Sequence, residues 1–306
     1  MTEAKNLSIT PNGPGDGRYV RFFSQIGIGD VPLVGGKNAS LGEMYQELTP
    51  RGIRVPNGFA VTAEAYRHTL DQAGAWTALH AALDGLDPDN VEDLARRAAR
   101  AREIVYTSMP PAAVEADIRA ALAKLTAEYG GELTVAVRSS ATAEDLPNAS
   151  FAGQHDTYLN IRGEAAVLDA VRHCFASLFT DRAIRYRIDN GFDHFKVFNS
   201  VTVMKMARSD LAASGVIFTI DTETGFENVV FLTGAYGLGE NVVQGAVDPD
   251  EFYVFKPTYR QGKRGVLKRT LGAKKIKMIF ADKGRETTRN IPTDQKEREK
   301  YCITDE

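Results

Sequence analysis

Residues 134–153 read Thr-Val-Ala-Val-Arg-Ser-Ser-Ala-Thr-Ala-Glu-Asp-Leu-Pro-Asn-Ala-Ser-Phe-Ala-Gly. The apolar run Thr134–Val137 predicts a short buried strand, with Arg138 at its carboxyl end. The residues after Arg138 are small, hydroxyl-bearing or glycine, which is typical of a loop. An arginine beside backbone N–H groups and hydroxyls offers donors in fixed geometry, as a polyphosphate requires. A lone Arg-Ser-Ser would instead favour a surface loop with one solvated arginine.

A second glycine-containing segment, Val34-Gly-Gly-Lys37, has complementary properties. The glycine pair lets the backbone approach an anion, and Lys37 supplies a mobile positive charge. Residues 38–48 predict a helix, whose amino end would add its dipole to phosphate binding. The segment lacks the spacing of a Walker A loop, and by itself it fits a plain turn before a helix. Together with Arg138, it indicates a nucleotide site.

The stretch before Arg138 has a helical pattern. Residues 62–129 are rich in alanine and are interrupted near Asp87-Pro-Asp-Asn90, where turn residues predict a break between helices. Asp89 or Asn90 is expected to cap the helix that contains Val91–Tyr106, because either side chain can accept a hydrogen bond from the first turn.

Beyond the Arg138 loop, a strand is expected at Thr157–Ile161. The next segment predicts a helix with one apolar face, formed by Val167, Leu168, Val171, Phe175 and Leu178. From about residue 200 the pattern changes to strands, expected at Val201–Met206, Gly215–Ile220, Val229–Thr233 and Glu251–Phe255. The closing Lys274–Lys277 predicts a solvated edge strand rather than a binding patch.

These motifs resemble the amino-terminal nucleotide-binding part of the phosphoenolpyruvate synthase and pyruvate phosphate dikinase family, to which rifamycin phosphotransferase is related. The resemblance begins in Val34–Met44 and Val137–Asn160. It continues through Ala176–Ile184, Arg208–Phe226, Tyr236–Tyr253 and Leu271–Lys277. The segment His155–Ile161 is as similar to the antibiotic kinase as to the synthase. By contrast, Ser214–Phe226 and Val243–Tyr253 are similar to the synthase.

The resemblance implies an α+β, ATP-grasp-like fold of two lobes, with the nucleotide between them. Residues 1–18 are expected to form a mobile tail. Residues 19–200 are expected to form the first lobe, which carries the phosphate loops and the helical segment 62–129. Residues 201–306 would form a second, strand-rich lobe that is incomplete at its carboxyl end.

The resemblance also assigns ATP-binding residues. It implies that Lys37 and Arg138 contact the phosphates, that Gly153 approaches them with its backbone, and that Thr157 lies alongside. Met204 occupies the strand-end position where relatives hold the adenine edge, often with glutamine. Methionine cannot reproduce the hydrogen bonds of a glutamine amide, so only a packing or backbone role transfers. The alternative for Met204 is an ordinary core residue.

Magnesium is the second expected cofactor, and Glu240 is its candidate ligand because Mg²⁺ prefers carboxylate oxygen. The alternative is a solvated loop carboxylate. Glu144 and Asp145 lie in the Arg138 loop, but their charge opposes direct phosphate contact and favours a capping or lid role.

In the family, ATP transfers a pyrophosphoryl group to a histidine, phosphate is lost to water, and the remaining phosphoryl group passes to pyruvate in a separate domain. None of the five histidines has the sequence context of that phosphocarrier, so no catalytic residue is expected here. Pyruvate would act only through a C-terminal domain outside this sequence. We therefore expect this chain alone not to complete the reaction, and expect the full-length protein to be a homodimer. The alternatives are the same portion of a rifamycin phosphotransferase or a non-catalytic nucleotide-binding module.

Composition limits the partners, the disulfide bonds and the location that can be expected for this chain. The 306 residues carry a formal net charge of −3, which gives no reason to expect nucleic acid or an anionic membrane as partner. The two cysteines, Cys174 and Cys302, cannot form a disulfide framework, and Cys174 is expected to be a buried, inert thiol. The sequence shows no signal peptide and no apolar stretch of membrane-spanning length. The expected location is the cytoplasm.

Overall fold

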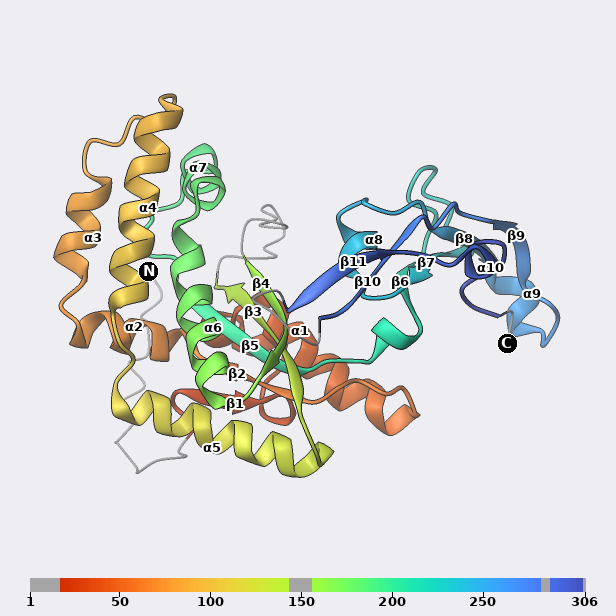
Figure 1. The fold of residues 1–306 in the computed structure, drawn as a ribbon, viewed down its shortest axis with the longest axis horizontal. Helices are drawn as coiled ribbons and strands as arrows, with labels where there is room; N and C mark the ends of the chain where they lie inside the picture. Colours follow the sequence, from red (N-terminus) through yellow and green to blue (C-terminus); the bar gives the residue numbers. More distant parts are fainter. Residues whose placement is uncertain (1–16, 143–155, 282–286, 305–306) are drawn as a thin grey trace, which may run out of the picture. The chain divides into compact units, whose positions relative to one another are not determined.

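The computed structural model describes residues 17–142, 156–281 and 287–304 (Figure 1). The chain divides into Met1–Met206, called unit 1, and Ala207–Glu306, called unit 2. Both units combine helices with antiparallel sheets, as the expected α+β class requires. No described helix is long and apolar enough to cross a membrane.

Unit 1 is built on a five-stranded sheet with the order β1-β2-β5-β3-β4, in which neighbouring strands are antiparallel. Its strands are β1 (Val20–Phe22), β2 (Gly58–Val61), β3 (Thr134–Ala141), β4 (Thr157–Arg162) and β5 (Asn199–Lys205). The strand expected at Val201–Met206 to open the second lobe is therefore β5 of unit 1. It pairs with β2 on one side and with β3 on the other, which fixes it inside this sheet.

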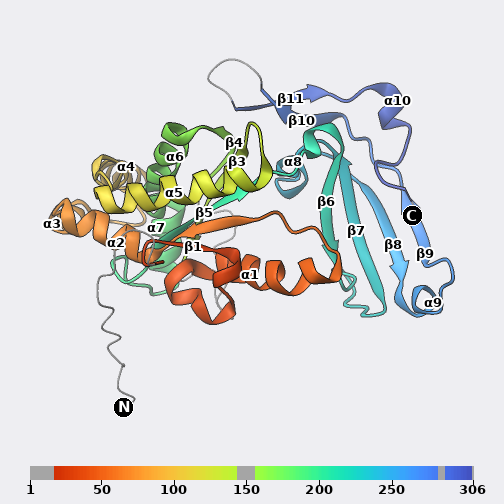
Figure 2. The same cartoon turned by 90° about the horizontal axis from the view of Figure 1, so that it is seen from below.

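Helices cover both faces of this sheet. Helix α1 (Val31–Leu48) packs on one face and α6 (Glu164–Ala176) on the other (Figure 2). The other helices of unit 1 are α2 (Ala63–Gln72), α3 (Trp76–Leu83), α4 (Val91–Thr107), α5 (Ala112–Tyr129) and α7 (Asp181–Asp189). Short 3-10 helices span Phe23–Gln25, Ile28–Asp30, Thr49–Arg51 and Ser177–Phe179.

Local sequence signals explain several of these elements. Asn90 caps α4 by accepting hydrogen bonds from the N–H groups of Glu92 and Asp93, both at 3.1 Å, which confirms one of the two expected caps. The predicted apolar face of α6 is also confirmed, because all of its members are buried: Val167, Leu168, Val171, Phe175 and, in the following turn, Leu178. Burying a side chain of this size contributes about 1.5–3 kcal/mol, so this face anchors α6 to the sheet.

The expectation that β3 ends at Val137 is wrong. The strand continues to Ala141 because Ser139, Ser140 and Ala141 keep pairing with β5, opposite Val201, Ser200 and Asn199. Arg138 thus lies inside a central strand instead of at its carboxyl end.

Unit 2 contains a four-stranded antiparallel sheet with the order β6-β7-β8-β9, formed by Ala213–Phe218, Val229–Tyr236, Asp250–Phe255 and Val266–Thr270. A hairpin of β10 (Ile276–Phe280) and β11 (Thr288–Pro292) joins it through a bridge between Gly237 and Met278. The short helices are α8 (Glu240–Val243), α9 (Lys256–Arg260) and α10 (Gln295–Arg298), with a 3-10 turn at Ser209–Leu211.

The expectation of a solvated Lys274 is also wrong. Its side chain is fully buried and forms an ion pair with Asp250, which is equally buried. The sequence pattern fails here because the acidic partner lies on β8, distant in sequence from Lys274.

Candidate phosphate-binding face of unit 1

Strand register places the predicted phosphate residues on one face of the sheet. Arg138 on β3 lies opposite Thr157 on β4 and opposite Thr202 on β5. Side chains at paired positions share a face, and residues two apart on a strand share it as well. Arg138, Thr157 and Ser140 therefore all lie on the same face as Thr202.

That face is the one covered by α1. Thr202 Oγ1 donates to Asn38 Oδ1 on α1 at 2.7 Å. The Asn38 N–H donates to Ser140 Oγ at 3.2 Å. Lys37 precedes Asn38 directly, so the glycine-lysine segment is brought to the strand that carries Arg138. Two motifs separated by about a hundred residues therefore meet at one place, as the sequence predicted.

The segment itself has the backbone that its glycines permit. Within α1, Gly35 has φ 75° and ψ 163°, which interrupts the helix and leaves a second helical segment beginning at Gly36. A side chain at Gly35 would collide with Ser140, because a Cβ there would lie 2.2 Å from the Ser140 carbonyl oxygen. Only glycine satisfies both the left-handed φ and the close approach. Lys37 thus stands in the first turn of the second helical segment, where N–H groups and the helix dipole favour an anion.

Electrostatics link the two predicted cations. Burial raises the pKa of the Cys174 thiol well above its usual range, and the Asp156 carboxylate raises it further, whereas Lys37 and Arg138 act in the opposite direction. Both cations therefore act on the same buried sulfur, which places them in one neighbourhood of unit 1. The prediction of a buried Cys174 is confirmed, because its side chain is fully buried in α6.

Arg138 has donor capacity to offer a ligand. Its side chain is half-buried, and its buried Nε has no hydrogen-bond acceptor within the residues that the structure describes. A buried guanidinium N–H without an acceptor is unfavourable by about 1–3 kcal/mol. A phosphate oxygen would satisfy such a group, so the residues present fit the triphosphate that the sequence implies.

The remaining predicted residues are placed as follows. Thr157 is exposed at the start of β4. Met204 lies on β5 opposite Ala136 and Gly58, and packs with the small apolar cluster between α1 and the sheet, which includes Phe23 and Val34. Its position two residues from Thr202 puts it on the same α1-covered face. Gly153, together with Glu144, Asp145 and His155, lies outside the described residues.

Glu240 belongs to unit 2, where it is the first residue of α8 and accepts a hydrogen bond from Gln244 Nε2 at 2.6 Å. In the described ranges, no group of three or more histidine, cysteine or acidic side chains is gathered as a metal site. A magnesium role for Glu240 therefore stays a prediction. Any ion there would need oxygen ligands from the phosphates and water, as is usual for Mg²⁺.

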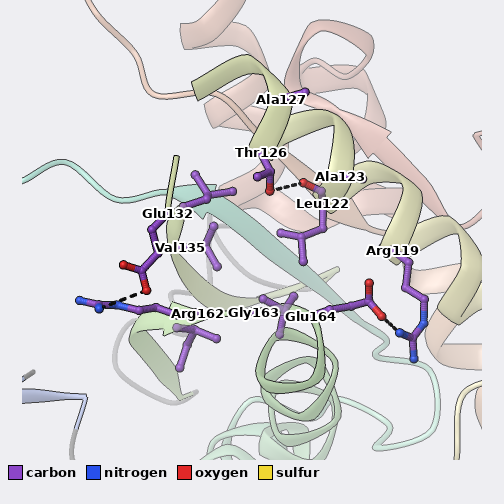
Figure 3. Close-up of a pocket in the computed structure, with 13 residues that line it drawn as sticks. Arg119, Leu122, Ala123, Thr126, Ala127, Glu132, Val135, Arg162, Gly163 and Glu164 are labelled. Carbon is purple, nitrogen blue, oxygen red and sulfur yellow. Dashed lines mark hydrogen bonds and ion pairs between the residues drawn. The ribbon is translucent and has the colours of Figure 1, made fainter. Parts of the chain in front are cut away.

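A separate cavity of about 780 Å³ opens on the α6 side of unit 1 (Figure 3). Its apolar walls include Val135 and Ile161, which pair across β3 and β4. At its rim, Arg119 pairs with Glu164, and Arg162 pairs with Glu132 at 3.5 Å. Among the described residues, none of the sequence-predicted ATP residues lines this cavity, so it is distinct from the phosphate-binding face.

Sequence reasoning missed the polar residues that join α1 to the sheet. Ser140 lies inside the quoted motif, and Asn38 follows Lys37, yet neither had an assigned role. Thr202 was interpreted only as part of the strand Val201–Met206, and Ser200 lay outside that predicted strand. The available signal was the presence of hydroxyl side chains in both β3 and β5, because serine and threonine are mostly exposed in proteins and need hydrogen-bond partners when they are buried.

A comparison with known families identifies the class of protein to which this chain belongs. The model of the pyruvate phosphate dikinase AMP/ATP-binding domain matches residues 31–306, and the chain belongs to this family. The matched range includes both the Gly35–Lys37 segment and strand β3.

The chain is also similar to individual phosphoenolpyruvate synthases. It is 53% identical over 292 residues to the enzyme of Neisseria meningitidis serogroup B, covering 94% of this chain and 37% of the relative. It is 52% identical over 291 residues to that of Helicobacter pylori, covering 94% and 36%. For the Escherichia coli enzyme the identity is 50% over 297 residues, covering 95% and 37%. The chain thus spans little more than a third of the length of these relatives.

Proposed function

We propose that this chain is the ATP-binding portion of a phosphoenolpyruvate synthase and that it binds Mg·ATP on the α1-covered face of unit 1. Lys37 and Arg138 bind the phosphates, with the Gly153 backbone and Thr157 alongside, and Met204 packs toward the adenine. Glu240 approaches the magnesium ion. The observation that carries this proposal is the meeting of the Lys37 segment with the Arg138 strand, which gathers two cations and a helix N-terminus.

The proposal extends to the fold. The finer fold assignment that we propose is an ATP-grasp-like nucleotide-binding domain, to which unit 1 contributes the phosphate-binding face.

In the whole protein, the reaction proposed is the conversion of pyruvate, ATP and water to phosphoenolpyruvate, AMP and phosphate. The bond between the α- and β-phosphates breaks, and the pyrophosphoryl group passes to a histidine outside this sequence. Water removes the terminal phosphate, and the remaining phosphoryl group passes to the enolate oxygen of pyruvate. The role of this chain is to hold and orient ATP, because phosphoryl transfer depends on positioned cationic groups. The corresponding location is the cytoplasm, and the assembly is a homodimer.

The test uses the full-length protein, incubated with Mg·ATP and either pyruvate or rifamycin. Pyruvate-dependent formation of AMP and phosphoenolpyruvate supports the proposal. Consumption of ATP that depends on rifamycin and not on pyruvate would replace it with the antibiotic kinase. The 306-residue chain alone is expected to give neither product. Pyruvate-dependent turnover by this chain would contradict the proposal that its role is to hold and orient ATP.

A further inference from the structure

We propose that Ser140 and Asn38 are positioning residues, which clamp the Lys37 segment to strand β3 and so set the spacing of Lys37 and Arg138. This inference rests on the proposed function and deepens it. It assigns the geometry of the phosphate site to two buried uncharged side chains that need not touch the nucleotide.

Ser140 acts as a helix cap supplied by another strand. The second segment of α1 begins after Gly35, so Gly35 holds the N-cap position and Asn38 the third position of the helix. An N-cap side chain ordinarily accepts a hydrogen bond from the second or third N–H, but glycine has no side chain. Ser140 Oγ lies 2.4 Å from the place of a Gly35 Cβ, and it accepts from the Asn38 N–H at 3.2 Å. The same hydroxyl donates to the Val34 carbonyl at 2.9 Å. Ser140 therefore forms hydrogen bonds with the backbone on both sides of Gly35, the residue that interrupts α1.

Asn38 completes the clamp with its side chain, which is fully buried. Its Nδ2 donates to the Val34 carbonyl and to Ser200 Oγ, each at 3.0 Å. Its Oδ1 accepts from Thr202 Oγ1 at 2.7 Å. The Ser200 hydroxyl donates a hydrogen bond to the Val61 carbonyl oxygen at 2.7 Å. The amide therefore links the interruption in α1 to β5, and through β5 to β2.

The clamp couples the two phosphate-binding cations. Lys37 lies between Gly35 and Asn38, and Arg138 lies two residues before Ser140 on the same face of β3. Two residues of strand span about 6.5 Å, so one buried hydroxyl fixes the Lys37 backbone close to Arg138. Fixing both groups before ATP arrives lowers the entropy lost on binding.

The experiment measures the affinity of the chain for Mg·ATP by calorimetry, in the parent, Ser140→Ala, Asn38→Ala and Lys37→Ala, and in the double variant Ser140→Ala/Lys37→Ala. Ser140→Ala is expected to weaken ATP binding about tenfold, because the charged hydrogen bond between Lys37 and a phosphate is lost when Lys37 is no longer held in place. If Ser140 acts through Lys37, the same change in the Lys37→Ala background should alter the affinity less than about twofold.

The matched control is Asn199→Ala. Asn199 is a fully buried asparagine on the same strand as Ser200, but its Nδ2 donates to the Cys174 carbonyl at 2.6 Å, on the α6 side of the sheet. Asn199→Ala should lower stability and leave ATP affinity within about twofold of the parent. An affinity loss equal to that of Ser140→Ala, or full additivity with Lys37→Ala, would overturn the inference.

Hydrogen exchange tests the clamp without nucleotide. Exchange at the Asn38 amide should accelerate about tenfold in Ser140→Ala and not in Asn199→Ala. An unchanged exchange rate at the Asn38 amide overturns this inference and leaves the proposed ATP site standing. Failure of the parent chain to bind Mg·ATP would remove the proposed ATP site, and with it the role of the clamp in binding.

Discussion

Replacing Lys274 with methionine is expected to destabilise unit 2 and to leave unit 1 intact. The Lys274 ammonium and the Asp250 carboxylate are both fully buried. Lys274 Nζ donates to Asp250 Oδ1 and also to the Gly272 carbonyl, the latter at 3.0 Å. Methionine preserves the length of the apolar stem, so the change removes the charge and its hydrogen bonds with little loss of packing.

The size of the stability loss depends on the hydrogen bonds that the Asp250 carboxylate retains in Lys274→Met. Removing one partner of a buried ion pair costs about 3–5 kcal/mol, because the other charge stays buried without compensation. Asp250 still accepts from the N–H groups of Gly272, at 2.9 Å, and Cys302, at 2.7 Å. Because of these donors we expect a loss near the lower limit, about 3 kcal/mol, equivalent to a fall in Tm of about 12–24 °C for a unit of this size.

The assay exploits the single tryptophan of the chain, Trp76, which lies on α3 in unit 1. Its fluorescence during thermal unfolding follows unit 1, and hydrogen exchange of peptides from β8 and β10 follows unit 2. The control is Lys275→Met, because Lys275 is the exposed neighbour of Lys274 and its replacement should change stability by less than about 0.5 kcal/mol. Equal exchange in the two variants would refute the reasoning.

Three further predictions concern unit 1. Gly35→Ala should lower the free energy of unfolding by about 3 kcal/mol or abolish folding, because φ 75° disfavours a side chain and its Cβ would meet Ser140; a urea midpoint equal to that of the parent would contradict this. Burial and the neighbouring Arg187 guanidinium lower the pKa of His194 to about 4. The unfolded chain binds a proton near pH 6.5 and the folded chain does not, so about 2–3 kcal/mol of stability present above pH 6.5 is lost as the pH falls toward 4. Urea titrations across this range should show the loss, and His194→Asn should remove it. The Cys174 thiol, whose pKa burial raises, should resist a thiol-specific reagent at pH 8 until the chain unfolds; labelling of Cys174 in the native chain at the rate of a free thiol would show that it is accessible.

The sequence predicts features that depend on local chemistry. The valine-rich start of β3, the apolar face of α6, the Asn90 cap and the helix after Gly-Gly-Lys37 all follow from residues adjacent along the chain. The Lys37 and Arg138 motifs were joined because both have the chemistry of a phosphate site, and the hydrogen bond from the Asn38 N–H to Ser140 brings their two segments together.

Features set by distant partners were missed. Ser139 and Ser140 have the composition of a loop, yet β5 pairs with them and α1 accepts and donates hydrogen bonds at Ser140. Strand β5 was assigned to the second lobe because its partners β2 and β3 are remote in sequence. Lys274 seemed solvated because its neutralising partner, Asp250, is 24 residues away. The errors at Ser140 and Lys274 each concern a polar group whose burial is made favourable by a contact that periodicity does not reveal.

The most direct test of the phosphate site is calorimetric titration of the chain with Mg·ATP, in the parent, Arg138→Ala and Arg162→Ala. Arg162 is a matched control, because it lies at the end of β4 and pairs with Glu132 at the rim of the separate cavity. We predict saturable binding by the parent and by Arg162→Ala, and at least about tenfold weaker binding by Arg138→Ala, the loss expected for one charge-assisted phosphate contact. Equal affinity in Arg138→Ala and the parent would contradict the assignment of this face as the phosphate site.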